Sequence, residues 1–174
     1  MKTAIDGKLA RRIDRYSIEN GMPSMVLMER AALCTAECVK NITKNKNLRK
    51  NVIAVCSVGN NGADGLAAIR MLKADGYNCK ALIIGNTELA TEEFKAQLGL
   101  IHFWGIPVKQ WEEDIHADIF DEYNIIVDAV FGIGLSRNVE GEYERLVECI
   151  NEVYLMQFQI LHIPKVWTSR RHAV

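Results

Sequence analysis

The stretch that decides the fold runs from Asn51 to Tyr77 and reads NVIAVCSVGNNGADGLAAIRMLKADGY. It begins with a short apolar run, which predicts a buried strand over about residues 52–58. A polar segment containing glycine follows, and then an amphipathic pattern that predicts a helix over about residues 64–75. A strand, a tight loop and a helix N-terminus in this order gather unpaired backbone N–H groups, so the stretch predicts an anion-binding site.

The polar segment of this stretch carries its own chemical information. Gly62 and Gly65 are expected to allow positive φ and a close approach of a phosphate or ribose to the main chain. Asn60, Asn61 and Asp64 add oxygen atoms that suit a sugar hydroxyl or a hard cation. A dinucleotide dehydrogenase would instead carry Gly-x-Gly-x-x-Gly, whereas this segment reads GNNGADG. Ordinary hydride transfer is therefore not predicted.

The bulk properties of the chain limit its possible partners. Its 174 residues predict one domain, and a net charge of −1 with a pI of about 6.4 gives no electrostatic reason to expect nucleic acid or a membrane surface. No apolar segment is long enough to cross a bilayer and no signal peptide is recognisable, so a cytoplasmic location is expected. The five cysteines are expected to be buried free thiols; Cys34 and Cys38 share a helix face but lack zinc-site spacing.

Apolar strands alternate with amphipathic helices along the chain. Helices are expected over about residues 4–20, 23–45, 91–104 and 140–154, with Pro23 as the first helical residue. Strands are expected over 79–84, from 108, and over 124–129 and 158–163, whereas the rest of the run up to Tyr123 is polar and predicts no element. This alternation predicts a parallel sheet covered by helices on both faces.

A second strand–glycine segment, VDAVFGIGLSRNVEGEY, spans residues 127–143. Gly132 and Gly134, with Ser136 and Arg137, could surround a phosphate through backbone N–H groups and a guanidinium. Asp128 ends an apolar strand, and it is either an acidic cap satisfied by loop N–H groups or a contact to a cation or ligand. Because ligands bind beyond the carboxyl ends of parallel strands, the two segments are expected to face one crevice.

The motifs GNNGADGLAAIRML and DAVFGIGLSRNVEGEY, together with LMERAAL at residues 27–33, resemble the NAD(P)H-hydrate epimerase family, the YjeF N-terminal domain. The resemblance covers roughly residues 10–164. It implies an α/β fold, a Rossmann-like three-layer α/β/α sandwich with a mostly parallel central sheet, in a domain over residues 1–164 followed by an atypical tail over 165–174. It also implies an isomerase that interconverts the R and S epimers of hydrated NADH and NADPH and works as a homodimer. Its S epimer would be the substrate of an NAD(P)H-hydrate dehydratase, which is either fused to it or separate.

The same resemblance assigns roles to individual residues. The potassium ion of the family, its implied cofactor, would be held by Asn61 and Asp128. Ala63 stands where the family usually has glycine, which requires a backbone without positive φ at that position. The substrate-binding positions carried over are Asn60, Asn61, Gly62, Ala63 and Asp64, and, around the phosphates, Gly132, Ile133, Gly134, Leu135, Ser136, Arg137 and Asn138.

The chain departs from the family after its last expected strand. The family motif Asp-x-Pro-Ser-Gly corresponds here to His162, Ile163, Pro164, Lys165 and Val166. The catalytic acid/base is therefore unassigned: His162 occupies the aspartate position, where it either shuttles a proton or is structural. Lys165 cannot ligate a cation, because ammonium has no acceptor.

Residues 165–174 lack periodicity and are interpreted either as out of frame or as the end of a naturally shortened protein. Two functions remain open. One is a potassium-dependent epimerase, and the other is a catalytically silent nucleotide-binding or dimerisation module of the same fold. Binding of ADP-ribose without epimerisation would identify the second.

Overall fold

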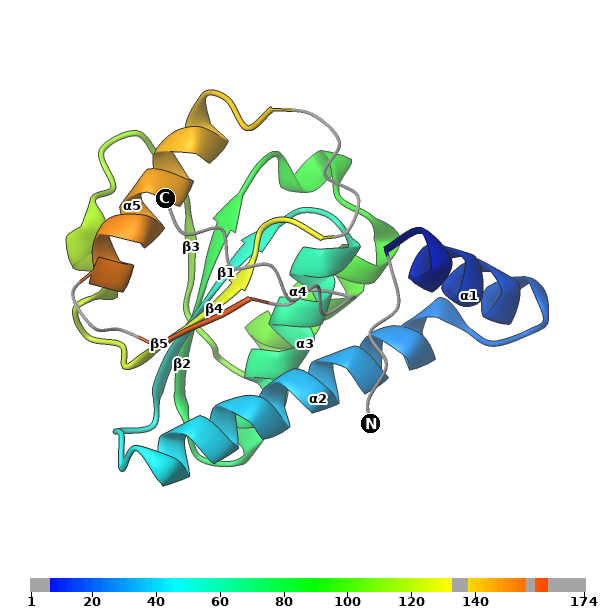
Figure 1. Cartoon of the computed structure of the whole chain (residues 1–174), viewed down its shortest axis with the longest axis horizontal. Coiled ribbons are helices and arrows are strands. Elements are labelled where there is room, and N and C mark those ends of the chain that lie inside the picture. The colour runs from blue at the N-terminus through cyan, green and yellow to red at the C-terminus, as the bar shows by residue number, and fades with distance from the viewer. Residues whose placement is uncertain (1–6, 133–137, 156–158, 163–174) are drawn as a thin grey trace.

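The computed structural model describes residues 7–132, 138–155 and 159–162, which alternate between helices and strands (Figure 1). Each helix and strand expected from the sequence is present. The helices are α1 (Gly7–Glu19), α2 (Ser24–Asn45), α3 (Asn60–Ala74), α4 (Glu92–Phe103) and α5 (Glu142–Leu155). The strands are β1 (Asn51–Ser57), β2 (Asn78–Ile84), β3 (Val108–Gln110), β4 (Ile125–Ala129) and β5 (Gln159–His162), and two 3-10 turns are η1 (Thr87–Leu89) and η2 (Ala117–Phe120).

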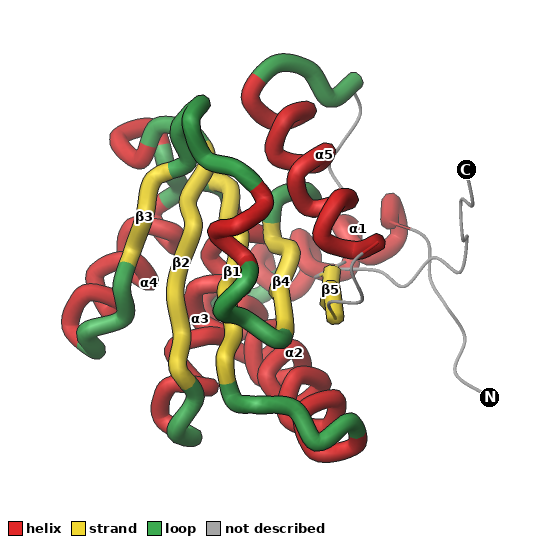
Figure 2. Tube along the Cα trace, turned by 90° about the vertical axis from the view of Figure 1, so that its left-hand side faces the viewer, coloured by secondary structure: helices red, strands yellow, loops and turns green. Residues whose placement is uncertain are grey.

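The described strands form one parallel sheet in the order β3-β2-β1-β4-β5 (Figure 2). β1 lies in the middle, where Val52 is in register with Cys79 of β2 on one side and with Ile125 of β4 on the other. The chain leaves β1 through α3 towards β2 and later returns to the opposite side of β1 as β4. The strand order therefore reverses between β1 and β4, which is where open parallel sheets bind their ligands.

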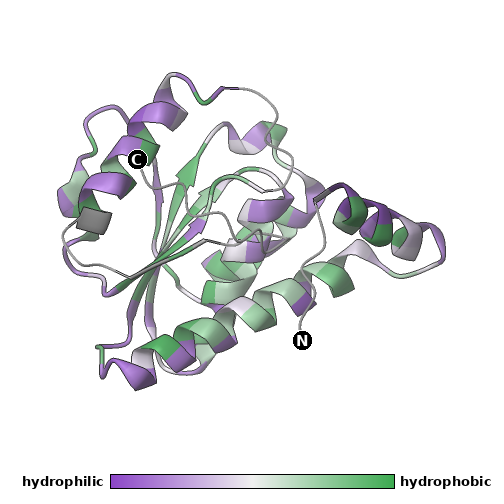
Figure 3. Cartoon of the chain, in the orientation of Figure 1, coloured by the Kyte–Doolittle hydropathy of each residue, from purple (hydrophilic) through white to green (hydrophobic). Residues whose placement is uncertain are grey.

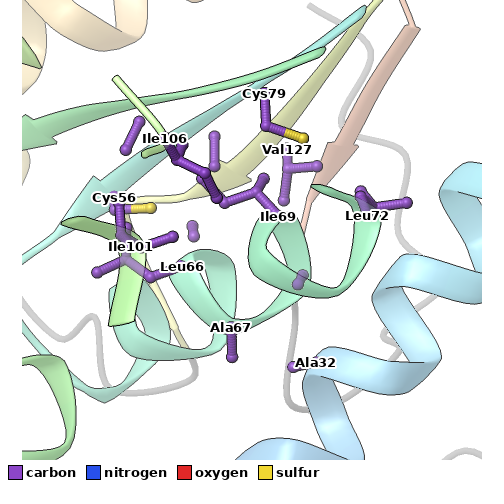
Figure 4. Packing of buried hydrophobic residues seen from close by; sticks show 14 of the residues in the cluster. Ala32, Cys56, Leu66, Ala67, Ile69, Leu72, Cys79, Ile101, Ile106 and Val127 are labelled. Atoms are coloured by element: carbon purple, nitrogen blue, oxygen red, sulfur yellow. The ribbon is translucent and has the colours of Figure 1, made fainter. Parts of the chain in front are cut away.

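Apolar side chains cover both faces of the sheet, because successive residues of a strand point to opposite sides. Val52, Ala54 and Cys56 of β1 join a buried cluster with α2, α3 and α4 (Figure 4). Ile53 and Val55 join a second cluster with α5 and the η2 region. Hydrophobic residues predominate in the strands, whereas hydrophilic residues are frequent in helices such as α1 and α5 (Figure 3). The three-layer α/β/α arrangement expected from the sequence is confirmed.

A polar network fixes the layer of helices on one face. Arg70 of α3 donates from Nη2 to Oε1 and Oε2 of Glu29 on α2, at 2.6 and 2.7 Å. Its Nε donates to Oε1 of Gln97 on α4 at 3.2 Å, and the amide of that fully buried Gln97 donates to Glu29 at 3.2 Å. Three helices are thus joined by one planar guanidinium.

Three expectations need correction. Pro23 is not the first helical residue but the N-cap of α2, because its ψ of 135° lies outside the helical region. The polar run before Tyr123 contributes Trp111, Ile115 and Phe120 to the second buried cluster. Of the free cysteines, Cys34 and Cys38 are exposed, whereas the remaining ones are buried.

Within the described residues, no helix combines the length and apolar character needed to cross a membrane. The expected tail, residues 165–174, lies outside the described part of the chain.

Candidate functional site

The segment between β1 and α3 is not a loop, as the sequence predicted, but the first turn of α3. The helix begins at Asn60, and the backbone N–H of Ala63 donates to the carbonyl of Gly59 at 3.0 Å. Gly62 and Gly65 lie inside this helix and are absent from the positive-φ positions, so the positive φ expected at both is wrong. The need for glycine at position 62 is steric instead: a Cβ on Gly62 would lie 1.6 Å from the carbonyl oxygen of Ser57. Glycine therefore lets the helix start directly against the end of β1.

The first turn of α3 separates its side chains between solvent and interior. Asn60 is exposed, whereas Asp64 and Ala63 are fully buried, Ala63 within the apolar cluster. Because Ala63 is helical, it needs no positive φ in place of the family glycine. Asn61 is 8% exposed, and neither atom of its side-chain amide has a hydrogen-bond partner among the described residues. A buried amide of this kind costs stability, which makes the turn a candidate for contact with a ligand.

The segment after β4 reaches this turn, as expected. A Cβ on Gly132 would lie 3.5 Å from Cβ, Cγ and Oδ1 of Asn61, so the two segments meet at one edge of the sheet. Asn138 is exposed. The positions Ile133, Gly134, Leu135, Ser136 and Arg137, expected around the phosphates, lie outside the described residues.

Asp128 lies in β4, half-buried, next to the same edge. Its Oδ1 accepts a hydrogen bond from the backbone N–H of Val130 at 3.0 Å. The capping interpretation is thus confirmed for one carboxyl oxygen, and a cation contact stays a prediction. Burial, with the charge of Asp128 adding to it, raises the pKa of the Cys56 thiol, which keeps that cysteine neutral beneath the site.

His162 is the last residue of β5, and its backbone is in register with Asp128. The structure therefore brings the position of the family aspartate to the same edge as the other candidate residues. Lys165 lies outside the described residues.

The donor atoms at this edge are suited to a hard monovalent cation rather than to a transition metal. Among the described residues, no group of three or more His, Cys, Asp and Glu side chains is arranged to hold a metal ion. The unsatisfied amide of Asn61 and the carboxylate of Asp128 nevertheless supply oxygen, the ligand atom that hard cations prefer. The residues present therefore fit the expected potassium ion.

Sequence reasoning missed a cavity of about 40 Å³ beside the first turn of α3. Its wall includes Asn60 and Asp64, and also Asp14, Ser24 and Glu93 from three other helices. The Ser24 hydroxyl donates to Oε1 of Glu93 at 2.6 Å. No sequence signal singles these residues out, because Glu93 reads as an ordinary first-turn acid of a helix and Asp14 as part of a polar helix face.

Comparison with known proteins agrees with this geometry. The family model described as YjeF-related protein N-terminus matches residues 24–163. The chain is 40% identical over 148 residues to an NAD(P)H-hydrate epimerase of Oenococcus oeni, covering 84% of this chain and 67% of that protein. It is 38% identical over 153 residues to an NAD(P)H-hydrate epimerase of Lentilactobacillus buchneri, covering 87% and 67%.

A solved structure has the same fold. The crystal structure of the yeast protein ynu0 superposes with a TM-score of 0.81 and 27% sequence identity, covering 93% of this chain and 70% of that one. The fold defines a Rossmann-like parallel α/β domain, with a candidate ligand site where the strand order reverses. The chain belongs to the YjeF-related N-terminal family, and it spans about two thirds of the length of the curated relatives it matches, 67% for the two named above.

Proposed function

We propose that this chain is an isomerase, an NAD(P)H-hydrate epimerase that interconverts the R and S forms of hydrated NADH and NADPH. The relatives named above carry this activity in their names. The observation that supports it most in this chain is the buried amide of Asn61, which has no partner among the described residues and faces Gly132 of the second segment. An unsatisfied buried group at a strand-order reversal is the arrangement expected where a ligand completes the site.

The binding scheme follows from the residue types. The first turn of α3, from Asn60 to Asp64, would contact the substrate. The segment from Gly132 to Asn138 would hold the phosphates. Asn61 and Asp128 would hold a potassium ion, whose charge offsets that of the diphosphate. The hydrated cofactor is the substrate, a dehydratase that consumes the S form is the proposed partner, and the cytoplasm is the proposed location.

A homodimer is part of the same proposal. α1 buries one residue, Ala10, and presents Ile13 and Tyr16 with 48% and 69% of their surface exposed. An apolar stripe of this kind favours pairing with a second copy. Light scattering after gel filtration measures the mass, and a monomeric mass at working concentration contradicts the dimer without affecting the catalytic proposal.

The alternative is a silent nucleotide-binding module of the same fold. Its support is His162, which occupies the position of the family aspartate at the end of β5. If the histidine silences the chain, His162→Asp creates epimerisation where the wild type has none. If the wild type is active, His162→Ala tests whether the imidazole transfers the proton. Loss of epimerisation in this variant would support that role, and full activity would exclude it.

The deciding experiment follows R and S epimers by chromatography, starting from the R form, in potassium and in lithium buffers. We expect epimerisation by the wild type in potassium and a loss of about 10- to 100-fold in Asn61→Leu and Asp128→Asn. Asn78→Ala, at the exposed amino end of β2, is the matched control and should retain activity. No exchange by the wild type, combined with tight binding of ADP-ribose, would establish the silent module instead.

Asn61→Leu also gives a stability prediction. Because the variant removes an unsatisfied buried amide, we expect its free energy of unfolding in potassium-free buffer to exceed that of the wild type by about 1 kcal/mol. Urea unfolding measures this difference. Loss of activity together with a gain in stability indicates a residue kept for binding. A loss of both would mean that the amide has a structural partner.

A further inference from the structure

The cavity of about 40 Å³ beside α3 has no role in the binding scheme above. Asn60 and Asp64 form one side of its wall, so it adjoins the proposed substrate site directly. α1 contributes Asp14 and Ile18, although α1 precedes residues 24–163, which the family model matches. The cavity therefore lies between α1, which the family model does not match, and the first turn of α3, which carries the proposed site.

The chemistry of the wall selects the kind of group that can enter. Asp14, Asp64 and Glu93 contribute carboxyl groups, and among the described residues that line the cavity none is Lys, Arg or His. Ionised carboxylates only accept hydrogen bonds, and they repel phosphate. The 2.6 Å hydrogen bond from Ser24 to Glu93 fixes the Glu93 side chain in the wall, since the two residues anchor α2 to α4 at this point. The cavity thus suits a hydrogen-bond donor without negative charge.

The volume of the cavity further limits which chemical groups fit into it. A buried water occupies roughly 10–15 Å³ of such a volume, so about 40 Å³ accommodates a group of roughly three non-hydrogen atoms. A primary amide has that size, and so does an exocyclic amine with the ring atom that carries it. Of the apolar residues in the same wall, Met28 is buried, whereas Ile18 is 45% exposed.

A second feature of the same turn of α3, on its Gly132 side and outside the cavity, supports a ligand there. Asn61, the neighbour of Asn60, is more than nine-tenths buried, and its amide is unsatisfied within the described residues. We propose that the cavity is the subsite for an uncharged hydrogen-bond donor of the dinucleotide, a primary amide or an exocyclic amine, with Asp14 and Glu93 as its acceptors. This rests on the proposed function, which supplies the ligand. The diphosphate then lies on the Gly132 side of the turn, away from the carboxyl groups.

The test is a set of calorimetric titrations with hydrated NADH. Asp14→Asn and Glu93→Gln each replace one acceptor oxygen by an NH₂ group, and the Glu93→Gln side chain still offers an oxygen to Ser24. We expect each to weaken binding about tenfold, the loss typical of a hydrogen bond to a charged group. Glu92→Gln is the matched control: it removes the same charge one residue away, where the side chain is 88% exposed, and it should bind within twofold of wild type.

Two fragments identify which donor enters the cavity. Weaker binding of ADP-ribose by Asp14→Asn assigns the cavity to the adenine amine, and weaker binding of nicotinamide mononucleotide assigns it to the carboxamide. Either result supports the subsite. Wild-type affinity in both Asp14→Asn and Glu93→Gln, with unchanged unfolding midpoints, overturns it, and so does an equal loss in Glu92→Gln.

The two proposals fail separately. A wild type that binds hydrated NADH without epimerising it overturns the proposed activity, while the same titrations still decide the subsite. A wild type that binds neither the hydrated cofactor nor either fragment overturns the subsite as well.

Discussion

At the scale of single residues, two glycines inside helices differ in whether packing requires them. Gly62 in α3 has no room for a side chain, because a Cβ would lie 1.6 Å from the Ser57 carbonyl oxygen. Gly99 in α4 is exposed, and a Cβ there would meet nothing within 4 Å. Gly62 is thus required by packing, whereas Gly99 only adds flexibility to the unfolded chain.

Alanine substitutions at these glycines should therefore have opposite effects on stability. Gly62→Ala should lower the free energy of unfolding by about 3 kcal/mol or more, because the clash is with backbone that cannot move aside. Gly99→Ala should raise it by about 0.5–1 kcal/mol through helix propensity. Urea unfolding followed by circular dichroism measures both. An equal effect of the two substitutions would contradict the close approach of α3 to β1.

The sequence predicted which residues of the first segment carry the site, but not how the backbone holds them. Asn61 and Gly132 were expected in one crevice because both follow parallel strands, and they do meet. The helical conformation of Gly62 was missed, since glycine in a polar segment is more typical of a turn. Asp14 and Glu93 were missed because they reach the cavity only through tertiary packing of α1 and α4.

At the scale of elements, the arrangement of α2, α3 and α4 depends on the guanidinium of Arg70. Arg70→Leu leaves Glu29 and the fully buried Gln97 without their shared partner. Since the Arg70 side chain is only 18% exposed, we expect a loss of about 2 kcal/mol. Lys95→Gln breaks the exposed pair with Glu92 and is the control, with an expected change within about 0.5 kcal/mol. Similar losses in both variants would show that the network adds nothing beyond a surface pair.

Element types were predictable because strands and helices carry different apolar periods. The run Val52–Cys56 is continuous, as expected for a strand buried on both faces, and α4 begins at a Thr91 cap, whose hydroxyl accepts from the N–H of Phe94 in the first turn. The start of α3 was placed too late, since its apolar pattern begins only at Leu66. The burial of Trp111 and Phe120 was not predicted, because both lie in a run rich in acidic residues. In the folded chain they belong to the same buried cluster as residues of α5.

At the scale of the whole molecule, the free cysteines are distributed over different layers, so their reactivity measures how well each layer is shielded from solvent. Cys34 and Cys38 are exposed on α2, Cys56 and Cys79 lie in the cluster beneath α2, α3 and α4, and Cys149 lies in the cluster beneath α5. Burial raises the pKa of Cys79 to about 12 and that of Cys149 to about 11. The buried thiols are therefore both shielded and held neutral.

We expect Ellman's reagent to label two thiols per native chain at neutral pH and all five after unfolding in urea. Because folding raises these pKa values, the neutral thiols stabilise the fold fully below the ordinary value of 9, and this contribution falls as the pH rises towards 11 for Cys149. The free energy of unfolding should thus decline over that range, and less steeply in Cys149→Ala. Labelling of Cys149 in the native protein would indicate that the α5 layer opens independently.

The central place of β1 has a consequence for the order in which the molecule assembles. β1, α3 and β2 are contiguous from Asn51 to Ile84, so they can form one crossover unit by closing a short loop. β4 pairs with the same β1 only after a much longer segment has been brought back. We therefore expect the crossover unit to be structured in the folding transition state and β4 to join later. The contact of Gly132 with Asn61 should then form among the last, so that a partly folded chain would lack the proposed nucleotide site.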